Sequence, residues 1–432
     1  MQEQNIQKEK VIIAYVNTYT NDELFSYHFN EVINLAEACD FEVVDTIIQN
    51  LDHPKAKTYL GSGKLDELKM MKDALEVDTI IFADELSPSQ ISNLQKYLDV
   101  EVIDRNMLIL TIFEKRAKTK EAVLQVKIAK LKYMLPRLIG SRDYMSRTGG
   151  GASGAVGARR GSGETKLELD QRHIEKQIYK AQSELKDVVK NRQEARKSRK
   201  ANDVKVVAFV GYTNVGKSTT INNLIEMFNN DNLEEKAVFV KNMLFATLET
   251  TTRRIKTNNN HEFLITDTVG FVSNLPHHLI ESFKSTLEEI LDADLVVHVI
   301  DASSPYLDLQ VSTTIEVLNE LGIKDIPILN VYNKIDLIND FVLQSLETKD
   351  NLFISGKTKD GYSDLIDRIE TILYPNQHKI ELLIPYDKGE ILNKIITHSI
   401  VNKTEYLGNG IYVEAIVSEY LYNLYKQYEI KK

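Results

Sequence analysis

The chain has 432 residues, 43% of them hydrophobic and 27% charged; one hydrophobic core does not grow to that size, so we expect two to four domains. No stretch approaches the roughly 18 apolar residues of a membrane span, and the polar segment MQEQNIQKEK has no apolar signal-peptide core behind it. The single cysteine excludes a disulfide framework, and together these features predict a soluble cytoplasmic protein, which we expect to be a monomer.

The net charge of −10 conceals a basic segment. Residues 111–200 contain 23 Lys and Arg against 10 Asp and Glu, a local charge of +13 that leaves −23 on the rest of the chain. A cluster of positive charge on one element is typical of proteins that bind nucleic acid phosphates. The alternative is a solvated helical face in a lysine-rich protein.

Residues 1–110 alternate short apolar runs with amphipathic stretches. The runs are VIIAYV (11–16), FEVVDTII (41–48), TIIFAD (79–84) and VEVID (100–104). Strands separated by helices of this length predict a small parallel α/β domain. Cys39 lies on the apolar side of one expected helix and is predicted to be a buried structural thiol.

The segment YLGSGK (59–64) resembles a phosphate-binding loop but lacks two of its elements. A P-loop needs a glycine where this chain has Thr58 and a hydroxyl where it has Leu65. A direct nucleotide role for this segment is therefore only the minor alternative.

Residues 111–202 predict two helices joined by a glycine-rich loop. Apolar residues recur at helical spacing on both sides of the loop, with Pro136 near the expected end of the first helix: Leu124, Ile128, Leu131 and Leu135, then Leu167, Ile174, Ile178, Ala181, Leu185 and Val188. Two such stripes can bury against each other as an antiparallel pair, so the loop RTGGGASGAVGARRGSGETK (147–166) is expected at the tip of a long arm. Its arginines offer planar donors to RNA phosphates and base edges: Arg147, Arg159 and Arg160.

Residues 203–375 predict a doubly wound parallel sheet that binds a nucleotide. The expected strand KVVAFV leads into GYTNVGKS (211–218), a complete G-x-x-x-x-G-K-S motif, and then into an expected helix. In such a P-loop the backbone amides surround the phosphates, Lys217 neutralises their oxygens and the Ser218 hydroxyl ligates Mg²⁺. The last residues, 376–432, predict a small α+β domain with two strands and two helices.

Two further tetrapeptides follow expected strands. In DTVG, Asp267 suits the magnesium shell and the Gly270 amide can reach the γ-phosphate. In NKID, the Asp336 carboxylate suits N1–H and the exocyclic amine of guanine, Asn333 braces the pocket and the Lys334 stem can lie over the ring. We therefore expect GTP and GDP to be preferred to adenine nucleotides.

The segment LFATLETTTRR (244–254) is rich in threonines that can reach Mg²⁺ and the γ-phosphate, and we choose Thr247 among them. Phe271 stands where many GTPases carry a glutamine that orients the attacking water, so slow intrinsic hydrolysis and strong stimulation by a partner are expected. The catalytic assignment is therefore Lys217, Thr247, Asp267 and Gly270.

These motifs, with DRNMLILTIFEKRAKTKEAVLQVKIAKLKYMLPRL and RGSGETKLELDQRHI before them, resemble the HflX family of translational GTPases over residues 10 to 375. The resemblance implies cytoplasmic GTP hydrolysis and binding to the large subunit of the 70S ribosome. It also implies an arm pointing to ribosomal RNA at the peptidyl transferase centre, a role in splitting stalled ribosomes under stress and, in some members, antibiotic protection.

The resemblance also assigns residues. The magnesium ligands fall on Ser218 and Thr247. The nucleotide contacts fall on five segments: Gly211, Tyr212, Thr213, Asn214, Val215, Gly216, Lys217 and Ser218; Phe245, Ala246, Thr247, Leu248 and Glu249; Asp267, Thr268, Val269 and Gly270; Asn333, Lys334, Ile335 and Asp336; Ser355, Gly356 and Lys357.

Three features depart from the family pattern. Glu249-Thr250-Thr251 replaces Asp-Pro-Thr, Gly356 replaces alanine, and the glycine-arginine loop is longer, which suits an antibiotic-resistance type of member. A different class of function remains open, namely a GTP-gated RNA-binding factor in large-subunit assembly or RNA remodelling. A third class, a signalling GTPase independent of RNA, predicts no salt-sensitive RNA binding.

Overall fold

The computed structural model describes residues 8–140, 166–201, 204–228, 251–273, 290–323, 325–339, 344, 346 and 351–430. Side chains of residues 139–140, 166–167 and 191–201 are outside the description. The described residues divide into two compact units, the first up to residue 195 and the second from residue 196 onward. None of the described helices combines the length and the apolar character that crossing a membrane requires.

The first unit begins with the predicted parallel α/β domain. Its four strands lie in the order β2-β1-β3-β4 and are all parallel: β1 (Glu9–Asn17), β2 (Phe41–Asn50), β3 (Thr79–Phe82) and β4 (Glu101–Asp104). The helices that alternate with them are α1 (Asp22–Ala38), α2 (Ser62–Leu75), α3 (Pro88–Leu98) and α4 (Arg105–Arg116). Cys39 is buried as predicted, and burial raises the pKa of its thiol to about 12.

The YLGSGK segment has a structural use in this domain. Tyr59 is 1% exposed, and its hydroxyl donates to Asp84 Oδ2 at 2.5 Å while accepting from the Val16 amide at 3.0 Å. Helix α2 begins at Ser62, directly after the N-cap Gly61. The segment therefore joins the sheet to α2 through a buried tyrosine.

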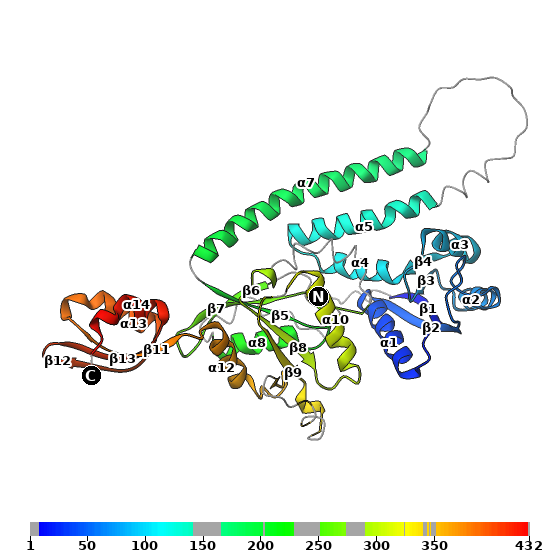
Figure 1. Cartoon of the computed structure of the whole chain (residues 1–432). Helices are drawn as coiled ribbons and strands as arrows, with labels where there is room; N and C mark the ends of the chain where they lie inside the picture. The colour runs from blue at the N-terminus through cyan, green and yellow to red at the C-terminus, as the bar shows by residue number, and fades with distance from the viewer. Residues whose placement is uncertain are drawn as a thin grey trace, which may run out of the picture. The chain divides into compact units, whose positions relative to one another are not determined.

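The predicted pair of arm helices is present. Helices α5 (Lys120–Gly140) and α7 (Lys166–Ala201) lie side by side in Figure 1. Three residues of the predicted stripes, Leu124, Ile128 and Ala181, form a buried cluster, and the partly buried Leu185 and Val188 pack against it. The residue 110 boundary that we drew between domain and arm falls inside α4, which packs on both α1 and α5.

Helix α5 ends at Gly140, so Pro136 lies in its last turn, near the end of the helix as predicted. The turn is held by the next residue, because Arg137 donates to the Tyr133 carbonyl at 2.6 Å and to Asp104 Oδ2 at 3.3 Å. Asp104 is fully buried, caps α4 through the Met107 amide and accepts from the Tyr133 hydroxyl. These bonds fix the end of α5 on the α/β domain.

The second unit contains a six-stranded sheet in the order β10-β9-β8-β5-β7-β6. Its strands are β5 (Lys205–Val210), β6 (Thr251–Lys256), β7 (Glu262–Asp267), β8 (Leu295–Asp301), β9 (Ile328–Asn333) and β10 (Leu352–Phe353). Helices α8 (Lys217–Phe228), α10 (Leu307–Glu320) and α12 (Tyr362–Leu373) alternate with them, and a short 3-10 helix, η1 (Ile335–Leu337), follows β9. All strand pairs are parallel except the antiparallel edge pair of β6 and β7.

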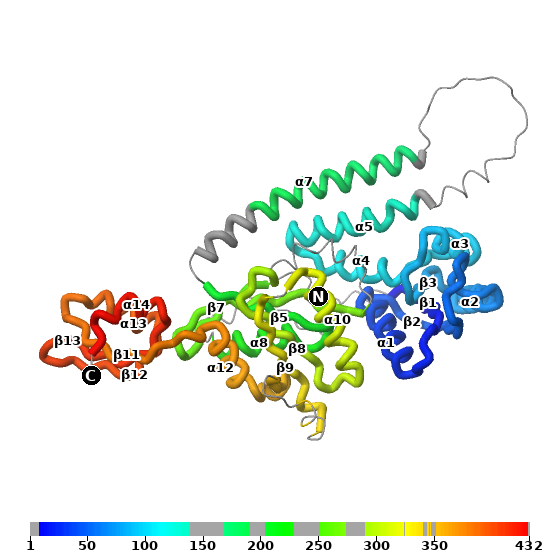
Figure 2. Tube along the Cα trace, in the orientation of Figure 1, coloured from blue at the N-terminus to red at the C-terminus, as the bar shows by residue number. Residues whose placement is uncertain are grey.

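A small antiparallel sheet of order β11-β13-β12 ends the chain, with helices on one of its faces (Figure 2). Its elements are β11 (Gln377–Ile384), η2 (Tyr386–Lys388), α13 (Gly389–His398), β12 (Ile400–Leu407), β13 (Gly410–Ser418), α14 (Glu419–Tyr425) and η3 (Lys426–Tyr428). Buried side chains of β11 and β13 pack against Ile395 of α13 and Leu421 of α14. The α+β class is as predicted, but strand β12 was not foreseen.

Candidate functional site

The predicted phosphate loop lies between β5 and α8 and requires its two glycines for steric reasons. Gly211 has φ +146°, and a Cβ there would lie 2.2 Å from the Val299 carbonyl oxygen. Gly216 has φ +96°, and a Cβ there would lie 2.2 Å from Asn333 Nδ2. Both values are far below contact distance. A side chain at position 211 would have to displace the backbone of β8, and one at position 216 would have to displace the Asn333 carboxamide.

Lys217 is the first residue of α8 and only 6% exposed. Its Nζ donates to the carbonyl oxygens of Gly211 at 3.0 Å and Tyr212 at 2.7 Å, so the ammonium group lies against the loop itself. Burial lowers the pKa of Lys217 to about 8, although the nearby Asp267 carboxylate acts in the opposite direction. A buried cation in this position is well suited to neutralise an anion held by the loop.

Ser218 and Asp267 bring a hydroxyl and a carboxylate together at the same edge of the sheet. Asp267 is the last residue of β7 and fully buried, and its Oδ2 accepts from the Ser218 hydroxyl at 2.6 Å. Hydroxyl and carboxylate oxygens are the ligands that Mg²⁺ prefers. The two side chains therefore fit a magnesium site.

The DTVG segment lies directly against the phosphate loop. The Thr213 amide donates to the Phe271 carbonyl at 2.7 Å, and the Phe271 amide donates to the Gly211 carbonyl at 3.1 Å. A Cβ at Gly270 would lie 2.8 Å from Thr213 Cγ2 and 3.0 Å from Thr213 Cα, so a glycine is needed where the chain passes the phosphate loop. The Phe271 side chain is 2% exposed and belongs to the core.

Asn333, at the end of β9, joins three of the predicted segments. Its Nδ2 donates to the Val215 carbonyl in the phosphate loop at 2.8 Å, and its Oδ1 accepts from the Gly356 amide at 3.0 Å. Asp336 lies close by and accepts from the Ser355 hydroxyl at 2.6 Å. The phosphate loop, NKID and SGK are therefore neighbours in the structure, as a nucleotide site requires.

Sequence reasoning missed Asp301, at the end of β8. Its Oδ2 pairs with Lys334 Nζ at 2.7 Å, and Lys334 has a left-handed backbone with φ 66°. The pair orients the lysine stem that we assigned to the base. An acidic residue at the tip of a third parallel strand was the available signal in the sequence.

Three more predicted residues of this site lie in its buried part. Tyr212 and Val269 are buried, the Thr268 hydroxyl donates to the Phe209 carbonyl at 2.6 Å, and the Tyr212 hydroxyl accepts from the Ser273 amide at 2.7 Å. Five predicted nucleotide contacts lie outside the described part of the chain: Phe245, Ala246, Thr247, Leu248 and Glu249. The three arginines predicted to contact RNA, Arg147, Arg159 and Arg160, also lie outside it.

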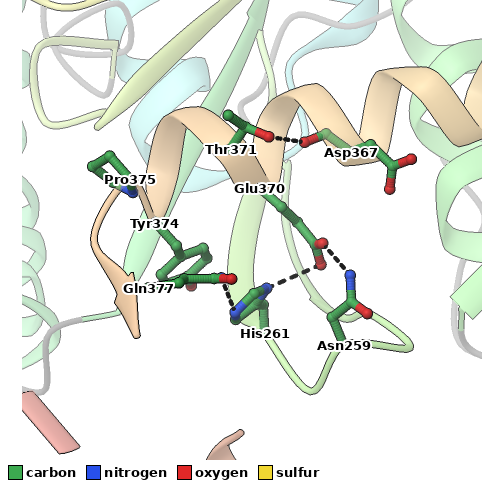
Figure 3. A pocket seen from close by; sticks show the side chains of 8 residues that line it. All are labelled: Asn259, His261, Asp367, Glu370, Thr371, Tyr374, Pro375 and Gln377. Atoms are coloured by element: carbon green, nitrogen blue, oxygen red, sulfur yellow. Dashed lines mark hydrogen bonds and ion pairs between the residues drawn. The ribbon is translucent and has the colours of Figure 1, made fainter. Parts of the chain in front are cut away.

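A polar pocket elsewhere in the second unit lies at the tip of the β6–β7 hairpin (Figure 3). There Glu370 of α12 pairs with His261 at 3.2 Å and accepts from Asn259 at 2.6 Å, while Gln377 of β11 meets the other nitrogen of His261 at 2.9 Å. Burial alone would raise the pKa of Glu370, but hydrogen bonds from His261, Thr257 and Asn259 hold it below its usual value. None of the predicted site residues lines this pocket. The contacts among its lining residues connect the hairpin to α12 and β11.

Comparison with known proteins gives three matching family models. Their descriptions are GTP-binding GTPase N-terminal (residues 26–114), GTP-binding GTPase Middle Region (116–199) and 50S ribosome-binding GTPase (206–334). The chain is 41% identical over 418 residues to the GTPase HflX of Caldanaerobacter subterraneus, covering 97% of this chain and 93% of that protein. It is 34% identical over 399 residues to the GTPase HflX of Escherichia coli, covering 91% and 90%. A solved GTP-binding protein of Sulfolobus solfataricus in complex with GDP shares 23% identity, with a TM-score of 0.44 and coverage of 84% and 98%.

Proposed function

The chain belongs to the HflX family of GTPases and hydrolyses GTP, and we propose that it does so as a cytoplasmic factor that binds the large ribosomal subunit and splits or rescues 70S ribosomes under stress. The observation that carries this proposal is the combination, in one chain, of the assembled nucleotide site with a basic two-helix arm. The match of residues 206–334 to a model described as a 50S ribosome-binding GTPase supports it.

We assign the nucleotide chemistry to residues that the structure brings together and to Thr247, which lies outside the described part of the chain. The loop amides and Lys217 hold the β- and γ-phosphates, and Asp336 accepts from the guanine edge. Mg²⁺, when bound, neutralises charge on the phosphate oxygens; Ser218 and Thr247 would hold it, with Asp267 orienting the shell. The Gly270 amide donates to the γ-phosphate. The protein groups in this scheme bind the base, stabilise charge on the phosphates or hold the metal ion, and none acts as a nucleophile.

The arm offers a surface for RNA. In the described part of the arm, helices α5 and α7 together expose eight basic side chains: Lys120, Lys127, Lys132, Arg172, Lys176, Lys180, Lys186 and Lys190. We assign contact with ribosomal RNA near the peptidyl transferase centre to the loop that joins these helices, through Arg147, Arg159 and Arg160. The added length of that loop suits displacement of an antibiotic bound there.

The test is the GTPase rate with and without purified large subunits, together with sedimentation of 70S ribosomes in the presence of protein and GTP. We expect strong stimulation by large subunits and loss of 70S particles. Deleting residues 147–163, or replacing Arg147, Arg159 and Arg160 by alanine, should remove both effects and leave GTP binding intact.

A matched control replaces three exposed lysines outside the arm, Lys55, Lys57 and Lys388, which changes the net charge equally. If this control loses as much activity as the arginine variant, charge alone explains the effect and the loop assignment is wrong. Co-migration with immature subunits, without any loss of 70S particles, would instead favour a role in large-subunit assembly.

A further inference from the structure

The loop assigned to the guanine base, Ser355–Lys357, has its central peptide groups held from two sides. The Gly356 amide donates to Asn333 Oδ1 at 3.0 Å. The Gly356 carbonyl accepts from Asn223 Nδ2 at 2.9 Å. Asn333 belongs to the base motif, whereas Asn223 lies on the helix α8, which begins with the phosphate-binding lysine.

The carboxamide of Asn223 is fixed in orientation. The side chain is 8% exposed, and its nitrogen also donates to the Tyr362 hydroxyl at 3.0 Å. A carboxamide nitrogen carries two hydrogens, so one is available for each of these acceptors. Tyr362, the first residue of α12, is 1% exposed and gives the amide a rigid second partner.

Glycine makes this restraint necessary. Gly356 has no side chain to pack, and glycine gives a loop more backbone freedom than any other residue. An alanine Cβ here would lie 3.2 Å from Thr219 Cγ2, so a larger residue that stiffens the loop is accommodated only if Thr219 shifts. The hydrogen bond from Asn223 supplies the order that a side chain would otherwise supply.

We propose that Asn223 is a positioning residue that fixes the backbone amides of the 355–357 loop for the 6-oxygen of guanine, and thereby contributes to base specificity. This inference rests on the proposed guanine site. It also links the two halves of nucleotide recognition, because α8 carries both Lys217, on the phosphates, and Asn223, behind the base loop.

The test uses three nucleotides that vary one group of the base at a time. GDP and 6-thio-GDP differ only at position 6, where sulfur is the weaker acceptor, and IDP lacks only the 2-amino group that we assign to Asp336. Dissociation constants are measured for the wild-type chain, Asn223→Ala and Asn223→Asp, the last of which keeps the shape but cannot donate.

We expect both variants to reduce the ratio of the 6-thio-GDP and GDP dissociation constants by about three- to tenfold, which corresponds to the loss of one neutral hydrogen bond. The ratio of the IDP and GDP dissociation constants should not change. Partial unfolding of a variant would weaken the binding of all three nucleotides by the same factor, and so would not by itself change either ratio of dissociation constants. Unchanged ratios would therefore overturn the proposal even where overall affinity falls.

Two further variants complete the design. Tyr362→Phe removes the second acceptor of Asn223 but keeps the bond to Gly356, so the 6-oxygen preference should persist; a loss equal to that of Asn223→Ala would contradict the assignment. Asp336→Asn should instead reduce the ratio of the IDP and GDP dissociation constants. If the wild-type chain binds both analogues as tightly as GDP, the assignment of the guanine site is wrong. If the wild-type chain prefers GDP but the Asn223 variants leave that preference unchanged, the guanine site is correct and the positioning role of Asn223 is wrong.

Discussion

The buried His298 predicts that the domain containing the six-stranded sheet loses stability at acidic pH. It lies on the interior strand β8, between β5 and β9, and is 2% exposed. Burial lowers the pKa of its imidazole to about 4; a side-chain hydrogen bond with Asn330 opposes this shift and the charge of Lys217 adds to it. The folded domain therefore keeps this histidine neutral well below the pH at which the unfolded chain protonates it.

The sign and size of the effect follow from proton linkage. Between pH 6.5 and about 4 the unfolded chain binds a proton at His298 that the folded chain does not, so stability falls as the pH falls. Each pH unit in this window removes about 1.4 kcal/mol, which gives a loss of roughly 2 kcal/mol at pH 5 relative to neutral pH. Above pH 6.5 His298 is mostly neutral in both states, so this loss of stability is largely absent there.

The assay compares the wild-type chain with His298→Asn, which keeps a polar side chain but does not titrate. Because the chain has two compact units, opening free energies are best measured by amide hydrogen exchange in β5 and β8, corrected for intrinsic rates. Carboxylates that titrate in both proteins cancel in the difference. The wild type should lose about 2 kcal/mol more than the variant between pH 7 and pH 5. An equal loss in the two proteins would refute the reasoning.

Three other substitutions test the site and the arm. Lys217→Ala should abolish GTP binding or turnover in calorimetry and phosphate-release assays, and normal turnover would remove the P-loop assignment. Asp336→Asn should weaken GTP binding by roughly 1.5–3 kcal/mol, the worth of hydrogen bonds to a charged group, so an unchanged dissociation constant would contradict the guanine assignment. Ile128→Ala should destabilise the α5–α7 pair by roughly 2–4 kcal/mol in thermal unfolding, whereas Val123→Ala, 46% exposed on the same helix, should be nearly neutral.

The interior strands were predictable because they are apolar throughout. The expected strands VIIAYV and TIIFAD became β1 and β3, which are buried over most or all of their length, and the first six residues of β8 are likewise buried. The two strands that were missed lie at sheet edges. In β6 only Ile255 is buried, and in β12 no residue is, so neither carries the apolar pattern that identifies a strand.

The residues of the nucleotide site also fall into those that the sequence predicts and those that it does not. The P-loop was predictable because its chemistry depends on residues that are consecutive in sequence, including glycines at positions that exclude any Cβ. The contacts that assemble the base side are not local. Asp301 is 33 residues from Lys334, and Asn223 is 133 residues from Gly356, so no spacing rule indicates either pair. Only the order of the strands in the sheet brings them together.

Phe271 shows how the two kinds of information combine. From the sequence, a phenyl ring at this position cannot orient an attacking water. In the structure the ring is 2% exposed, and the backbone of the same residue pairs with the phosphate loop on both sides of Tyr212. A glutamine at this position would bury an uncompensated amide in the core rather than present it to the γ-phosphate. The group that orients water therefore comes from another part of the chain or from the partner, which is the physical basis for expecting hydrolysis to depend on the ribosome.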